Sequence, residues 1–175
     1  MLGIERLLPE GIRGESMNFQ QKARHIPCAN CGQHTKKGGR AAFRLLEHTA
    51  DMGIEAVAPT CDELFVQAAK ALLSILAGQG RAFGDVQERT IEVTAGDMEE
   101  LLVVWLNELL FMIQARGLWP LDMAVVRIHA GALEMRLRVV PLAANPEREI
   151  KAVTYHHLLV THRHGQWRAR VYLDL

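Results

Sequence analysis

The chain has 175 residues, of which 20 are Lys or Arg and 20 are Asp or Glu, so its formal net charge is zero. This length suits one domain with a sizeable core, and a hydrophobic content of 49% excludes disorder along the whole chain. The neutral balance argues against tight, sequence-independent binding to nucleic acid, which needs an excess of basic residues. It leaves room for a local basic patch.

Neither a membrane span nor an export signal is visible in the sequence. The densest apolar stretch, residues 101–106, is followed at once by Asn107 and Glu108, and the first 14 residues lack the apolar core of a signal peptide. The chain has 3 cysteines, an odd number. We therefore expect reduced thiols, a cytoplasmic location and no membrane partner.

Residues 1–41 differ from the remainder of the chain. They are rich in glycine, end in a basic stretch and show weak hydrophobic periodicity. This pattern predicts a flexible N-terminal extension over 1–41, followed by the folded domain over 42–175.

The extension contains a CxxC motif with a histidine on each side. The four side chains are His25, Cys28, Cys31 and His34, which offer ligands that zinc accepts. A structural zinc site usually takes its second ligand pair from a separate turn, whereas these residues all lie within one short segment. We favour a flexible dithiol tail, and a zinc site is the alternative.

Alternation and capping signals predict the elements of the folded domain. Thr60 with Glu63, and Asp97 with Glu100, have the spacing of N-terminal helix caps. Strands are predicted at 43–47, 54–58, 86–94, 123–129, 133–140, 150–161 and 167–173, with helices from about 61 to 77 and from about 98 to 116. The order predicts a single α+β domain with a mixed or antiparallel sheet and two main helices.

Three segments carry polar residues that could form a site. His48 to Asp51 lie between the first two predicted strands, where a turn with a surface histidine is the simpler interpretation. At the other end, Asp174 and the carboxylate of Leu175 could bind a hard cation, unless the terminus frays in solvent. Taken separately, each of these two segments favours the simpler interpretation.

The third segment is the predicted strand over 150–157. Strict alternation would place Lys151, Val153, Tyr155 and His157 on one face, and His156 with its even-numbered neighbours on the other. Lys151 could neutralise nearby anions or meet a phosphate. A solvated edge strand explains the same pattern equally well.

Common catalytic motifs are absent. The sequence contains no GxxxxGK[ST] or GxGxxG loop for nucleotides, no GxSxG elbow and no HExxH helix. No pairing of a nucleophile with a base is visible either, which disfavours an independent hydrolase.

Four segments, in this order, resemble the archease family. They are residues 46–54, which contain His48 and Asp51, the helix at 101–111 with its WLNELL core, residues 150–156, and the final Asp174-Leu175. The resemblance covers about residues 42–175 and leaves the N-terminal extension outside.

The resemblance implies an accessory protein rather than an enzyme. Archeases assist RtcB-type RNA ligases, which join RNA ends that carry a 2′,3′-cyclic phosphate or 3′-phosphate to a 5′-hydroxyl. They promote guanylylation of the ligase by GTP and multiple turnover, in tRNA splicing or RNA repair. RNA and GTP would thus concern this protein only through the ligase. The alternative is a metal-binding, chaperone-like interaction module without a ligase role.

The resemblance also implies a divalent-cation site. The expected ion is calcium, with magnesium or manganese as alternatives, and its ligands would be Asp51, Asp174 and Leu175. Lys151 matches a family motif position and is expected to act near these acids. His48 and His156 are expected to orient the carboxylates.

Overall fold

The computed structural model describes residues 40–47, 52–77, 84–129, 131–144, 146 and 148–175. The predictions for His25, Cys28, Cys31 and His34, and those for His48 and Asp51, fall outside the described residues. Within these residues no helix is long and apolar enough to cross a membrane.

Nine elements follow one another in the order predicted from the sequence, and the α+β class is confirmed. They are β1 (Ala42–Glu47), β2 (Met52–Ala58), α1 (Cys61–Leu76), β3 (Gln87–Thr94), α2 (Met98–Gln114), β4 (Leu118–His129), β5 (Ala132–Pro141), β6 (Ala152–Arg163) and β7 (Gln166–Asp174) among the described residues. Both predicted caps form: Thr60 Oγ1 accepts from Glu63 N at 3.2 Å, and Asp97 Oδ1 from Glu100 N at 2.8 Å.

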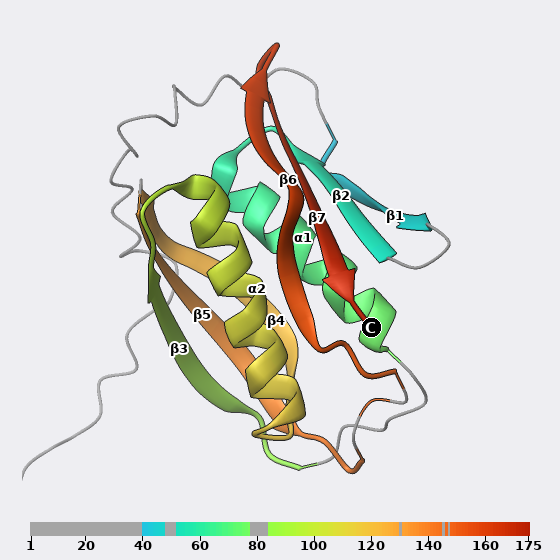
Figure 1. The fold of residues 1–175 in the computed structure, drawn as a ribbon. Coiled ribbons are helices and arrows are strands. Elements are labelled where there is room, and N and C mark those ends of the chain that lie inside the picture. Colours follow the sequence, from blue (N-terminus) through green and yellow to red (C-terminus); the bar gives the residue numbers. More distant parts are fainter. Residues whose placement is uncertain (1–39, 48–51, 78–83, 130, 145, 147) are drawn as a thin grey trace, which may run out of the picture.

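The strands form two antiparallel sheets, with the orders β1-β2-β7-β6 and β3-β5-β4 (Figure 1). Both helices contact strands of both sheets, so their apolar sides join the two inner sheet faces in one core. Trp105 of α2 is fully buried and donates its Nε1 hydrogen to the carbonyl of Phe65 in α1 at 3.4 Å. The indole thereby connects the two helices.

The largest difference from the predicted boundaries lies at the start of β4, since the other boundaries agree to within about two residues. The sequence predicts that Pro120 marks the end of the second helix, but this residue lies within β4, which begins at Leu118. Proline cannot donate a ladder hydrogen bond, and it is tolerated here because β4 is an edge strand whose register shifts directly after Pro120.

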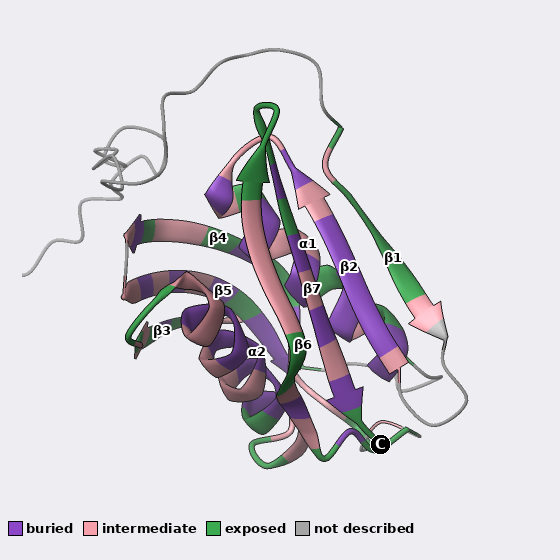
Figure 2. Ribbon diagram, turned by 45° about the horizontal axis from the view of Figure 1, so that its top comes forward, coloured by how far each residue is buried: buried purple, intermediate pink, exposed green. Residues whose placement is uncertain are grey.

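The four-stranded sheet has one covered and one open face. On β7, Trp167, Ala169, Val171 and Leu173 are buried on the side of the helices. The residues between them point away from the helices, onto a face that no other described element covers. Figure 2 shows β2 almost wholly buried in the middle of this sheet, whereas β1 at its edge is largely exposed.

Candidate functional site

The end of β7 lies beside the start of β6 and brings three predicted site residues together. The backbone N–H of Lys151 donates to the carbonyl of Asp174 at 2.8 Å. The Lys151 ammonium donates to the backbone oxygen of Leu175 at 2.7 Å and lies 4.0 Å from Asp174 Oδ1. All three residues are exposed, so these oxygens are accessible from solvent.

Side chains of α2 hold this part of β6 in place. Asn107 accepts from the Val153 N–H at 2.9 Å and donates to the Val153 carbonyl at 3.1 Å. Gln114 donates to the carbonyl of Ile150 at 3.0 Å, and Glu99 accepts from the N–H of Val160 at 3.0 Å. Because β6 is an edge strand, these side chains satisfy backbone groups that lack a neighbouring strand.

The supporting role of α2 was not predicted from the sequence, although a signal for it exists. Asn107 and Gln114 are seven residues apart, which places them on the same side of a helix. Two amides on one stripe next to an apolar face indicate side chains that bind an exposed backbone edge.

The predicted alternation over 151–157 is wrong beyond Thr154. Thr154 pairs with Tyr172, but the pairing resumes only between Leu159 and Arg170. The extra residues of β6 form a bulge, in which His157 has a φ of 48°. Tyr155, His156 and His157 are therefore all exposed, although strict alternation would place His156 on the opposite face from its two neighbours.

The bulge creates an aromatic cluster next to the end of β7. The rings of His156 and His157 lie 4.0 Å apart, centroid to centroid, and each is 6.0 Å from the ring of Tyr172. No hydrogen bond from His156 to a carboxylate is seen among the described residues, so the structure does not show it orienting Asp174. It contacts Tyr172 instead.

Two predicted residues, His48 and Asp51, lie outside the described residues. Met52, which follows Asp51 in the chain, pairs with Leu173, which precedes Asp174. Within the described ranges, no three His, Cys, Asp or Glu side chains gather in a metal-binding cluster. Asp174 and Leu175 supply only oxygen atoms, which is the ligand type that calcium and magnesium accept.

A buried carboxylate on the open sheet face was also missed from the sequence. Glu55 of β2 is only 5% exposed and is surrounded by three arginines. Arg44 Nε donates to its Oε2 at 2.6 Å and Arg170 donates to its Oε1 at 3.0 Å, with Arg168 at 3.7 Å. Burial raises the pKa of Glu55, but hydrogen bonds from Arg170 and Arg44 and the charges of Arg44 and Arg168 outweigh it, so the pKa is lowered.

Comparisons with known proteins match this domain. A model of the Archease protein family matches residues 43–175. Protein archease of Methanosarcina mazei is 34% identical over 140 residues, which cover 76% of this chain and 95% of that protein. The solution structure of protein 1598 of Methanobacterium thermoautotrophicum is 28% identical with a TM-score of 0.57, covering 77% of this chain and 99% of that one.

A further solved structure supports the fold. The crystal structure of a Thermotoga maritima protein, described as an archease and possible chaperone, is 20% identical with a TM-score of 0.51. The match covers 82% of this chain and 99% of that chain. Since the family model spans well over half of the sequence, the chain belongs to the archease family.

Proposed function

We propose that this protein is an accessory protein of an RtcB-type RNA ligase and performs no reaction of its own. It would promote GTP-dependent guanylylation and multiple turnover of the ligase in tRNA splicing or RNA repair, in the cytoplasm. Family membership supports this role. The observation that carries it is the exposed group of Asp174, Leu175 and Lys151, which presents charged atoms to solvent at the end of the four-stranded sheet.

A divalent-cation site is part of the proposal. Asp174 and Leu175 fit a hard cation chemically, because an oxygen of each already faces one cationic group, the Lys151 ammonium. Asp51 would be the third ligand, and the pairing of Met52 with Leu173 supports its assignment. A bound cation would neutralise the carboxylates and offer open coordination positions to oxygen ligands of the ligase or a nucleotide.

Ligase stimulation tests the role directly. We expect wild-type protein to raise both guanylylation by labelled GTP and multiple-turnover ligation by the cognate RtcB-type ligase. Asp51→Ala, Asp174→Asn and deletion of Leu175 should each lose this stimulation while keeping the fold. The first two remove a carboxylate ligand, and the deletion shifts the terminal carboxylate onto Asp174. Asp122→Asn, an exposed carboxylate on the other sheet, serves as the matched control.

Two results would contradict this proposal in different ways. Full stimulation by any of the three ligand variants would refute the cation site but not the ligase role. Failure of folded wild-type protein to stimulate the ligase would refute the ligase role. In that case the chaperone-like interaction module becomes the better function, in line with the description of the Thermotoga maritima structure.

Calorimetric titration with Ca²⁺ tests the cation site without the ligase. Asp174→Asn should abolish binding, because one of the few anionic ligands is lost. Lys151→Gln should tighten binding about fivefold, because the Lys151 ammonium contacts the same oxygens and would repel a bound cation. Two unit charges about 4 Å apart repel by roughly 1 kcal/mol even in water, which corresponds to about that factor. Weaker binding by Lys151→Gln would show that Lys151 supports the site rather than competing with the ion.

A further inference from the structure

The open face of the four-stranded sheet carries an excess of arginine. Arg44, Arg163, Arg168 and Arg170 come from β1, β6 and β7, and their positions alternate with residues that point to the helices. We call this surface the arginine face. Its described acids are Glu55 and, at the far end, Asp174.

The outer face of the three-stranded sheet has no such excess. There Glu88 and Asp122 both pair in register with Arg138, and Arg127 forms an ion pair with Glu134 at 3.6 Å. Positive charge is thus concentrated on one sheet, although the net charge of the whole chain is zero.

Glu55 does not neutralise the arginine face. One carboxylate serves Arg44, Arg168 and Arg170, and the buried Nε of Arg170 has no hydrogen-bond partner. Arg163 has no ion pair with any described residue and is exposed near the tip of the β6–β7 hairpin. The face therefore has positive charge left for an anionic ligand, and the exposed guanidinium of Arg163 supplies accessible donors.

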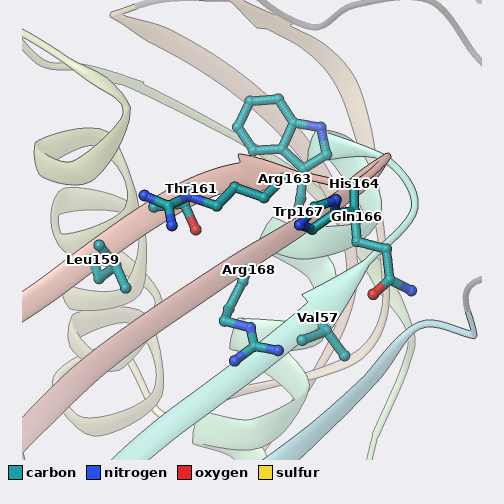
Figure 3. Close-up of a pocket in the computed structure, with 8 residues that line it drawn as sticks. All are labelled: Val57, Leu159, Thr161, Arg163, His164, Gln166, Trp167 and Arg168. Atoms are coloured by element: carbon teal, nitrogen blue, oxygen red, sulfur yellow. The ribbon is translucent and has the colours of Figure 1, made fainter.

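A hollow of about 370 Å³ lies at the hairpin end of the arginine face. Its lining comes from β2, β6, β7 and the hairpin tip, and Arg163 and Arg168 are drawn with Thr161 and Gln166 among its walls (Figure 3). Guanidinium, hydroxyl and amide groups in one concave surface are the donors that bind phosphate oxygens.

An aromatic cluster lies at the opposite end of the same face. In it the exposed rings of His156 and His157 lie against the half-buried ring of Tyr172. A basic surface joined to exposed rings favours a single-stranded nucleic acid over an acidic protein, because unpaired bases stack on such rings while phosphates contact arginine.

We propose that the arginine face binds single-stranded RNA directly, with phosphates on Arg163 and Arg168 and bases on the Tyr172 cluster. The geometry supports a single strand with phosphates and unpaired bases. The choice of RNA over DNA rests on the proposed function. RNA binding is measured on the isolated protein without the ligase. A failure of this proposal can therefore be told apart from a failure of the proposed ligase role.

Fluorescence anisotropy with a labelled 12-nucleotide oligouridylate at 50 mM NaCl tests the proposal on the full chain. We expect the double variant Arg163→Ala/Arg168→Ala to weaken binding about tenfold or more. It should also flatten the dependence of log affinity on log salt by about 1.4, since each lost phosphate contact on a single strand contributes about 0.7. In this variant Glu55 still accepts hydrogen bonds from Arg44 and Arg170, so the protein should remain folded.

Two further variants separate stacking from charge. His157→Asn removes the ring but tolerates the positive φ, and it should weaken binding about fivefold without changing the salt dependence. Arg138→Ala, an exposed arginine on the other sheet, should bind like wild type.

Four results would overturn the proposal. The first two are no RNA binding by wild type and a loss of RNA affinity in Arg138→Ala equal to that of the double variant. The third is tighter binding to the DNA oligonucleotide of matching sequence than to RNA. The fourth is displacement of the labelled RNA by polyglutamate as effectively as by unlabelled RNA. The last result would assign the face to an acidic protein. Ligase stimulation that persists without RNA binding would leave the proposed function intact.

Discussion

Glu55→Ala is expected to lower the free energy of unfolding by about 2–3 kcal/mol at pH 7. The carboxylate holds Arg44, Arg168 and Arg170 together, and its loss leaves three like charges on neighbouring strands. Removing one partner of a fully buried ion pair typically lowers the free energy of unfolding by about 3–5 kcal/mol. The loss expected here is smaller, because the arginine side chains are 37–66% exposed and water can solvate them in the variant. Urea denaturation followed by circular dichroism measures the change.

The pH dependence of this effect identifies its cause. The folded-state pKa of Glu55 lies below its ordinary value of 4.5, so its contribution is fully present above about pH 4.5 and is lost as the pH falls through the folded-state pKa. The stability difference between wild type and Glu55→Ala should therefore shrink in acid. A difference that stays constant down to pH 3 would assign the effect to packing rather than charge.

An exposed carboxylate provides the comparison. Glu92→Ala on β3 changes a residue that is exposed and forms no ion pair with any described residue. Its stability should stay within about 0.5 kcal/mol of wild type at every pH.

The features predicted correctly from the sequence depend on residues that are close to one another along the chain. Thr60 and Asp97 cap helices because each side chain reaches an N–H three residues further along, which is visible in the sequence itself. The strand and helix periods likewise repeat within a few residues. Element order and the α+β class follow from such local signals.

The missed features depend on which strands become neighbours. Glu55 stands between apolar residues of β2 and looks like an ordinary outward-facing acid. Arg44 and Arg170 become its partners only when β1 and β7 pair with β2. The bulge after Thr154 similarly arises from the pairing of β6 with β7, which the sequence of β6 alone does not specify.

The candidate site falls between these two cases. The residue types of Asp174 and Lys151 are visible in the sequence, but their proximity depends on the register of β6 against β7. The ammonium of Lys151 reaches Asp174 and Leu175 because Ala152 pairs with Asp174. The resemblance to archeases, rather than any spacing along the chain, is what predicts that these residues act together.

Asn107→Ala is the second change with a large expected effect, a loss of about 2–4 kcal/mol in the free energy of unfolding. The substitution leaves the N–H and carbonyl of Val153 without partners at a position that is only 3% exposed. Each unsatisfied buried group costs about 1–3 kcal/mol. Urea denaturation measures the total, and amide hydrogen exchange should show lost protection at Val153 in particular.

Two comparisons make this prediction specific to the support that α2 gives β6. Gln114→Ala removes one hydrogen bond, to the carbonyl of Ile150, and should lower the free energy of unfolding by about half as much. Glu108→Ala on the same helix should change the free energy of unfolding little. Because Lys151 lies between Ile150 and Val153, release of this segment should also weaken Ca²⁺ binding in calorimetry. Retained exchange protection at Val153 in Asn107→Ala would show that α2 does not hold the edge of β6.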